Sequence, residues 1–135
     1  MTLLPILRRD ERGAAAIEMA IALPVLVSMI YGIFQVGLLY QANAGMQHAL
    51  GEGARYATLC VPVSGACTTP SNTQIQTRIS SKLFGKGDGN FTVNAPVTGT
   101  GYRDLSISYT KKMNFVFING PTITLNRSKR AYTAS

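Results

Sequence analysis

The stretch that decides the fold is residues 14–40, which read AAAIEMAIALPVLVSMIYGIFQVGLLY. A helix needs about 20 apolar residues to cross a bilayer, so this stretch is long enough to span one. Between residues 19 and 51 there is no Asp, Glu, Lys or Arg. As a helix, that uncharged run would reach about 50 Å, well beyond a hydrocarbon core of about 30 Å. We therefore predict a long helix over residues 14–59, with a transmembrane segment at about residues 19–41.

Charge is distributed unevenly on the two sides of this stretch. Residues 1–13 form a short leader that carries Arg8, Arg9 and Arg12, whereas residues 52–135 carry ten Lys or Arg against three Asp or Glu. Arginines just before a span, with none soon after it, place the N-terminus in the cytoplasm. We therefore expect residues 60–135 to form an extracytoplasmic domain.

A secretory signal peptide is a competing interpretation of the apolar stretch. Ala42-Asn43-Ala44 matches the A-x-A pattern of a signal-peptidase site. The apolar region of a signal peptide normally runs about 7–15 residues, and this one is nearly twice that length. The length therefore favours a retained membrane helix.

Two residues are unusual for a plain anchor. Glu18 is an acid inside the apolar run, where an ionisable group is costly and needs a partner unless it reaches the interface. Pro24 removes one helical hydrogen bond and favours a kink, although membrane helices also tolerate proline without any such role. Glu18 thus either has a partner or reaches the interface, and Pro24 is a candidate kink.

The junction between leader and helix reads RGAAAIEMAIALPVL over residues 12–26. It resembles the processing site of type IV pilin-like precursors, which are cut after a Gly that lies five residues before a Glu. More specifically, it resembles the TadE-like family, whose hallmark is R-G-x-x-A-x-E-x-A-x-x-x-P. The residues that match this pattern are Arg12, Gly13, Ala16, Glu18, Ala20 and Pro24. Met19 replaces the usual aromatic, and residues 53–57, GARYA, resemble a later G-A-R-x-A segment of the family.

This resemblance covers roughly residues 8–60 and implies a function. TadE-like proteins are minor pseudopilins of the tight-adherence (Flp) pilus system in the bacterial inner membrane. Their implied partners are a prepilin peptidase, other pilins and pseudopilins, and inner-membrane assembly proteins. The peptidase would cut between Gly13 and Ala14. The new amine of Ala14 and the carboxylate of Glu18 are each unfavourable alone in lipid and offset one another when paired. The resemblance implies that Glu18 neutralises the amine of an adjacent subunit, so that Ala14 and Glu18 mediate helix docking in assembly.

Cys60 and Cys67 are the two cysteines of the chain. Beyond a membrane span, in an oxidising compartment, two cysteines favour a disulfide. Closing a loop of about eight residues in this way would contribute about 2.5 kcal/mol. The C-x6-C spacing is not that of a zinc site or a thioredoxin motif.

The sequence pattern of residues 60–135 predicts a small pilin-like α+β domain that packs on the long helix. Thr69-Pro70 can start a short helix whose apolar residues Ile75, Ile79 and Leu83 share a face, with Gly85 closing it. Alternation beyond it predicts three or four antiparallel strands. The candidate strands are residues 91–97, 105–109, 113–118 and 122–125, with a turn at 119–121 and a fraying end at 126–135.

Nothing in the sequence indicates catalysis, a metal or a cofactor. His48 is the single histidine, and the glycine-rich residues 85–90 lack the order of a phosphate loop or a calcium loop. The alternative to a pseudopilin is a single-span anchored module that binds an anionic extracellular ligand. Its candidate surface is Arg127, Lys129, Arg130 and Tyr132; specific nucleic-acid binding is not expected.

Overall fold

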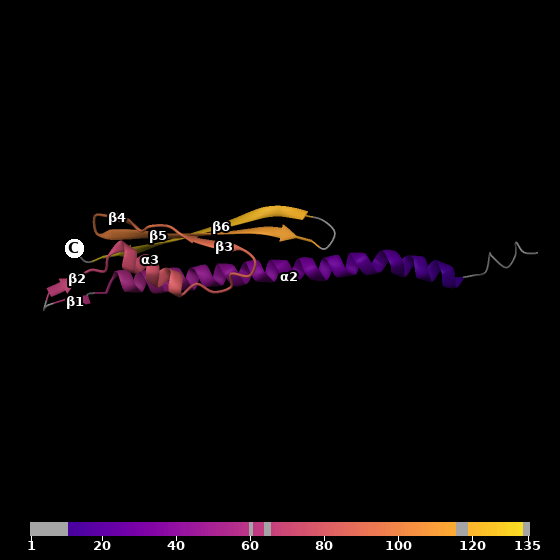
Figure 1. Cartoon of the computed structure of the whole chain (residues 1–135), viewed down its shortest axis with the longest axis horizontal. Helices are drawn as coiled ribbons and strands as arrows, with labels where there is room; N and C mark the ends of the chain where they lie inside the picture. The colour runs from indigo at the N-terminus through magenta and orange to yellow at the C-terminus, as the bar shows by residue number, and fades with distance from the viewer. Residues whose placement is uncertain (1–10, 60, 64–65, 116–118, 134–135) are drawn as a thin grey trace, which may run out of the picture.

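The computed structural model describes residues 11–59, 61–63, 66–115 and 119–133. Its dominant element is helix α2, Glu11–Ala57, which runs unbroken for 47 residues (Figure 1). At 1.5 Å per residue, such a helix is about 70 Å long. Pro24 lies inside it, and the Ser28 hydroxyl donates a hydrogen bond to the Pro24 carbonyl at 2.8 Å. The helix predicted from the apolar stretch is therefore present, and it projects far beyond the rest of the molecule.

The remaining elements gather around the C-terminal half of α2. They comprise two short strands, one short helix and a four-stranded antiparallel sheet. In chain order they are β1 (Val61–Val63), β2 (Ala66–Thr68), α3 (Asn72–Ser81), β3 (Asn90–Val93), β4 (Val97–Gly99), β5 (Tyr102–Asn114) and β6 (Asn119–Tyr132). The predicted α+β class, with a long apolar helix, a short helix and an antiparallel sheet, is confirmed.

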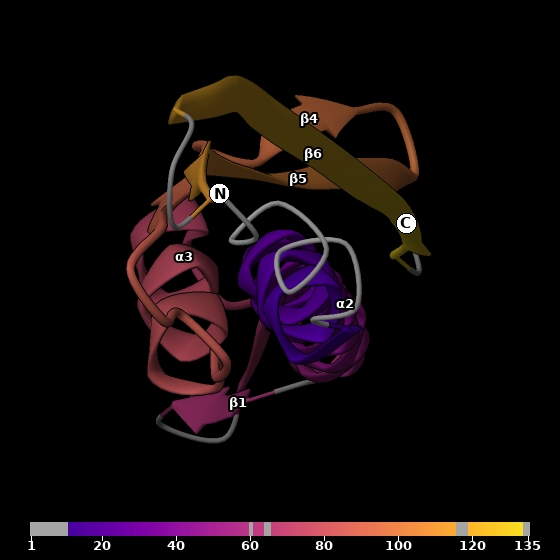
Figure 2. The same ribbon diagram turned by 90° about the vertical axis from the view of Figure 1, so that its right-hand side faces the viewer.

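Strand β5 is the centre of the sheet. β6 pairs with it from Tyr102↔Tyr132 to Asn114↔Asn119, with an irregularity between Lys112 and Asn114. β3 and β4 pair with successive segments of β5, residues 107–110 and 102–104. Because β6 occupies one edge of β5 along this length, β3 and β4 must share the other. The sheet covers one side of α2, and α3 lies beside the helix (Figure 2).

The hydrophobic core lies where β5, α2 and α3 meet. Alternate residues of β5 point at the helix, as the period of two in a strand requires. Ile75 and Ile79 of α3 fill the space between α3 and α2 and are fully buried. Two close approaches depend on glycine. An added Cβ at Gly45 would lie 2.1 Å from the Phe84 carbonyl oxygen, and one at Gly53 would lie 2.3 Å from Ile79.

The ends of α3 differ from those predicted. The helix begins after Ser71, not at Thr69-Pro70, because Ser71 and Gln74 form a reciprocal capping box. The Ser71 hydroxyl accepts from the Gln74 amide at 3.3 Å, and the Gln74 side chain accepts from the Ser71 amide at 2.9 Å. This arrangement satisfies two of the N–H groups that a helix start leaves unpaired. The helix ends at Ser81, so the prediction that Gly85 closes it was wrong.

The C-terminal strands also differ from the prediction. Residues 126–132 do not fray but continue β6, because β5 is long enough to pair with them as far as Tyr132. Residues 119–121 belong to β6 and are not a turn, and Met113 and Asn114 are the end of β5 rather than part of a separate strand. Residues 116–118 of that predicted strand lie outside the described residues.

The cysteine region forms a small hairpin that the sequence did not predict. β1 and β2 pair through Val61↔Thr68 and Val63↔Ala66, which places Cys67 opposite Pro62. Cys60 lies outside the described residues, so the Cys60–Cys67 disulfide stays a prediction.

Candidate functional site

The N-terminal half of α2 exposes an apolar surface, and among the described residues it is contacted only near Gly32, by Phe115. Ile17, Leu26 and Phe34 are 65%, 57% and 62% exposed, and their large apolar neighbours are similarly open. Soluble proteins rarely leave so extensive an apolar patch in water. Among the described residues, Gly13–Ala57 is the one helix long and apolar enough to cross a membrane, with a mean hydropathy of 2.0 over its most apolar window and none of that window buried. The apolar helix thus indicates membrane anchoring.

Glu18 heads a stripe along this exposed helix. The residues that line a shallow groove with it share one face, at spacings of three and four that bring side chains of a helix together. They are Ile21, Ala22, Val25, Leu26 and Met29. Among the side chains that the structure describes, none forms an ion pair with Glu18. The carboxylate therefore stands at one end of an apolar stripe that a second helix can contact.

The predicted processing site lies at the start of the same helix. Gly13 is exposed, and an added Cβ there would meet nothing within 4 Å. α2 already begins at Glu11, so the bond between Gly13 and Ala14 is within its first turn. The first N–H groups of a helix have no intrahelical partners, and this turn opens more easily than the helix interior.

Pro24 lies six residues beyond Glu18 on the helix. A proline has no N–H, so the carbonyl one turn before it loses its helical partner. Ser28 contributes a hydrogen bond one turn later, from its hydroxyl to the Pro24 carbonyl. The helix stays continuous through this point, and the role of Pro24 as a kink remains a prediction.

Among the described residues, three ion pairs join charged groups of the domain and of the part of α2 that it covers: Arg78 with Glu52, Lys111 with Asp88, and Arg130 with Asp104. Lys111 is fully buried on the helix-facing side of β5, and its Nζ lies 2.8 Å from Asp88 Oδ1. The ammonium beside it holds the pKa of the Asp88 carboxyl below its usual range. Tyr109 donates from its hydroxyl to the Lys86 carbonyl at 2.8 Å, and burial raises the pKa of this phenol.

The basic residues near the C-terminus do not form one patch. Arg127 and Lys129 pair with Ile107 and Leu105, both buried, so they lie on the face toward α2. Arg130 lies on the opposite face, where Nε and Nη2 donate to the two carboxylate oxygens of Asp104 at 2.7 and 2.8 Å. This pairing lowers the pKa of Asp104 and raises that of Arg130. A single docking surface for an anionic ligand is therefore not assembled from these side chains.

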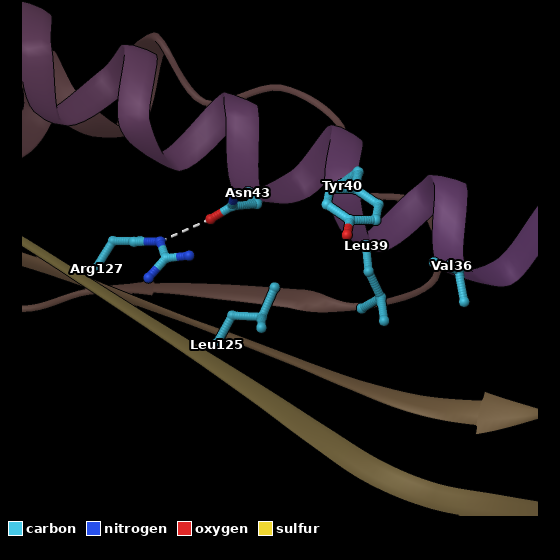
Figure 3. Close-up of a pocket in the computed structure, with 6 residues that line it drawn as sticks. All are labelled: Val36, Leu39, Tyr40, Asn43, Leu125 and Arg127. Carbon is cyan, nitrogen blue, oxygen red and sulfur yellow. Dashed lines mark hydrogen bonds between the residues drawn. The ribbon is translucent and has the colours of Figure 1, made fainter.

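Arg127 lies at one end of a groove between α2 and β6, which Figure 3 shows in close-up. The groove has a volume of about 290 Å³ and an apolar floor, with Asn43 and Arg127 as its polar residues. Arg127 Nε donates to Asn43 Oδ1 at 2.7 Å. The other residues that line it are Val36, Leu39, Tyr40 and Leu125.

The described residues contain no group of three or more His, Cys, Asp or Glu side chains that could hold a metal ion. His48 lies on the exposed side of α2, with its ring tilted against Phe84 at a centroid distance of 5.7 Å. Gly85 and Gly87 adopt positive φ angles in a turn next to Tyr109, and Asp88 of the same turn pairs with Lys111. The glycine-rich segment thus serves the packing of the domain.

Comparison with known proteins gives one family. No curated protein and no solved structure matches this chain. The family model of TadE-like proteins matches residues 13–55, which run from the predicted processing site through the exposed stripe to the GAR segment of α2. This match suggests a protein associated with the Tad pilus. Over residues 13–55 the chain matches the TadE-like protein family, and the resemblance indicated by the sequence motif is confirmed.

Proposed function

We propose that this protein is a minor pseudopilin that supports assembly or anchoring of a Flp-type pilus. A prepilin peptidase cuts between Gly13 and Ala14 and leaves the mature chain in the bacterial inner membrane. The C-terminal domain then lies on the outer side, as the arginines of the leader favour. The family match over residues 13–55 supports this proposal, because it covers the cleavage site and the exposed helix together.

The observation that carries the proposal is the isolated acid on an exposed apolar stripe. A carboxylate in lipid without a cation is costly. Cleavage after Gly13 creates an ammonium group four residues before Glu18, about one helical turn away. A neighbouring helix can contact the stripe that contains Ala22, Val25 and Met29 while its own terminal amine approaches Glu18. The pairing of charges then fixes the register of two otherwise smooth apolar surfaces.

The first experiment is to determine the N-terminal residue of the protein recovered from native membranes. A start at Ala14 supports peptidase processing. A start at Met1, in cells where the peptidase is active, contradicts the proposal. It favours instead the alternative of a single-span anchored module for an anionic ligand, which salt-sensitive binding to the exported domain would support.

The second experiment separates docking from anchoring. Glu18→Ala is compared with Met19→Ala, which truncates an exposed neighbour in the same turn but leaves the charge in place. We expect Glu18→Ala to be processed and membrane-bound yet lost from complexes with pilus components, whereas Met19→Ala behaves as the unaltered protein. Equal recovery of both variants in such complexes would show that Glu18 has no docking role.

A further inference from the structure

The groove between α2 and β6 changes from apolar to polar along the axis of the helix. Val36 and Asn43, which mark its two ends on α2, are seven positions apart and therefore about 10 Å apart along the axis. Val36 lies at the end nearer the exposed apolar half of α2, and Arg127 lies beside Asn43 at the other end (Figure 3). Leu39 and Leu125 line the groove between these ends.

Two polar contacts hold the walls of the groove in place. Near its apolar end, Gln35 is 3% exposed and its Nε2 donates to the Asn114 carbonyl of the β5–β6 hairpin at 3.4 Å. At its polar end, Arg127 Nε donates to Asn43 Oδ1 at 2.7 Å. The helix and the strand are thus fixed relative to one another on both sides of the space of about 290 Å³. The groove is formed before any ligand enters it.

The groove lies where the predicted transmembrane segment ends. That segment covers about residues 19–41, so Val36 falls inside it and Asn43 just beyond it. Tyr40, which also lines the groove, is 72% exposed at this level, as aromatic residues at a membrane interface often are. In the proposed orientation, the apolar end of the groove faces the hydrocarbon and the polar end lies at the level of the phosphate groups of the outer leaflet.

The polar end has free cationic donors. Arg127 uses Nε in its bond to Asn43, and its two Nη groups have no hydrogen-bond partner among the described residues. Lys129, two residues further along β6, lines the adjoining hollow and forms no ion pair within the part of the chain that the structure describes. Arg130 takes no part, because it lies on the opposite face and is paired with Asp104. A guanidinium with two free nitrogens matches the geometry of a phosphate group.

A second copy of the chain at the same height would not supply the missing anion. Residues 19–51 of α2 and 119–132 of β6 contain no Asp or Glu, so a copy placed alongside would bring only further basic groups. A phospholipid brings an acyl chain for the apolar end and a phosphate for the polar end, in the order in which a bilayer presents them. A zwitterionic headgroup would find no acid for its ammonium among the residues that line the groove, so an anionic headgroup is favoured.

We infer that the groove between α2 and β6 binds an anionic glycerophospholipid of the outer leaflet, with an acyl chain along Val36, Leu39 and Leu125 and the phosphate on the free Nη groups of Arg127. Asn43 is a positioning residue, because its bond to Nε fixes the plane of the guanidinium. The bound lipid ties β6, and with it the domain, to one height at the membrane surface. The inference rests on the proposed membrane anchoring of α2 and on the outward placement of the domain.

The test uses the absence of tryptophan from the chain. Tyr40→Trp places a fluorophore at the rim of the groove, and Phe34→Trp places one on an exposed part of α2 that does not line it. Each full-length variant is reconstituted in nanodiscs of phosphatidylcholine that contain a minor fraction of phosphatidylglycerol with brominated acyl chains. Quenching then measures the preference for phosphatidylglycerol next to each tryptophan. Nanodiscs in which all of the lipid is brominated phosphatidylcholine show whether each tryptophan contacts lipid at all.

We expect phosphatidylglycerol to be preferred about fivefold next to Tyr40→Trp, the factor that one basic residue gives near an anionic surface, and not to be preferred next to Phe34→Trp. Arg127→Gln in the Tyr40→Trp chain should abolish the preference. Lys112→Gln is the matched control, because it removes one exposed basic residue from the neighbouring strand without touching the groove. Equal losses from Arg127→Gln and Lys112→Gln would reflect a general attraction of charge and would overturn the site.

Two other results separate this inference from the proposed anchoring. If both tryptophans are quenched by brominated phosphatidylcholine but neither prefers phosphatidylglycerol, the chain spans the membrane and the lipid site is overturned. If neither tryptophan is quenched even when all of the lipid is brominated, the anchoring itself fails and the inference with it.

A measurement on the unaltered protein guards against disturbance of the groove by the new tryptophan. Native mass spectrometry of the full chain, released from the same lipid mixture without bromine, should show a retained phosphatidylglycerol. Arg127→Gln should lose this lipid, whereas Lys112→Gln should keep it. Absence of retained lipid, or retention of both lipids in their bulk ratio, overturns the inference. A dimer that carries no lipid also overturns it and assigns the groove to a second copy of the chain.

Discussion

Lys111 is wholly buried between β5 and α2, yet the carboxylate 2.8 Å from its Nζ, that of Asp88, is 56% exposed. The ammonium is therefore held inside the domain by an acid at the surface. Lys111 is one of the alternate residues of β5 that point toward α2, and it lies between the buried Tyr109 and Met113. A buried charge of this kind is costly unless it is paired, because the interior solvates it poorly. Asp88 thereby supplies the counter-charge of the buried Lys111, so the turn that carries Asp88 contributes to the stability of the core.

Removing the acid should therefore cost more than removing the buried ammonium, because the exposed carboxylate can be solvated without its partner. We expect Asp88→Asn to lower the free energy of unfolding by ~1–3 kcal/mol, since it leaves the ammonium buried without its counter-charge. Lys111→Met keeps the length of the side chain and removes the charge, and it should be neutral or stabilising. Denaturant unfolding of the full chain in detergent measures both. The explanation is wrong if Lys111→Met is the more destabilising of the two.

The same pair makes stability sensitive to acid. The pKa of Asp88 is lowered in the folded state by Lys111, so the carboxylate contributes stability that is complete above its unfolded pKa of about 3.9. That contribution is lost as the pH falls through the folded value. We expect the melting temperature to drop below about pH 4, with a smaller drop in Asp88→Asn. Asp104, whose pKa is also lowered by Arg130, retains its own acid dependence in that variant.

Gly45 and Gly51 of α2 offer a matched test of how the helix meets the domain. A Cβ at Gly45 would lie 2.1 Å from the Phe84 carbonyl oxygen, a backbone atom, whereas one at Gly51 would meet only the flexible end of Lys129 at 3.9 Å. Gly45→Ala should destabilise by ~1–3 kcal/mol through overpacking. Gly51→Ala should stabilise by up to ~1 kcal/mol through helix propensity. Thermal unfolding compares them, and equal effects would contradict the close approach at Gly45.

The long helix could be predicted from the sequence because its cause is local. An uncharged apolar run fixes both its helical state and its length. The ends of α3 could also have been found, since Ser71-x-x-Gln74 is a capping-box pattern, but Thr69-Pro70 gave a competing start signal. The extent of β6 could not be found in the same way. Residues 126–132 are polar and basic, and only their pairing with β5 makes them a strand.

The residues of the candidate site also differ in whether a local sequence pattern or a long-range contact identifies them. Gly13 and Glu18 are marked by a motif that the sequence displays directly, and the family match covers both. Gln35 gives no such signal, because its burial depends on a hairpin that returns from 79 residues away in the chain. Lys111 could have been identified by extending the alternation of Leu105, Ile107 and Tyr109 by one step. Long-range contacts, rather than weak local patterns, account for most of what was missed.

The cysteine pair gives a prediction that is independent of the membrane. If Cys60 and Cys67 are joined, the double variant Cys60→Ser/Cys67→Ser should lose about 2–3 kcal/mol of stability, from the loop entropy of the unfolded chain. Reduction of the unaltered protein should give the same loss. Mass spectrometry of a digest under non-reducing conditions identifies the bond directly. Alkylation of both thiols in protein taken from the oxidising compartment would show that no disulfide forms.

Gln35 provides the last prediction, because its single donated hydrogen bond fastens the hairpin to the helix. Gln35→Leu keeps a similar volume but removes the donor to the Asn114 carbonyl. We expect amides near Asn114 to exchange with deuterium faster in nanodiscs, by a factor that matches a loss of ~0.5–2 kcal/mol. Amides near Ile107 should stay protected, since their pairing with β3 and β6 is untouched. Phe34→Leu is the control, because it shortens an exposed neighbour without changing the contact. Identical exchange near Asn114 in Gln35→Leu and Phe34→Leu would show that apolar packing of Phe115 on Gly32 holds the hairpin without help from the amide.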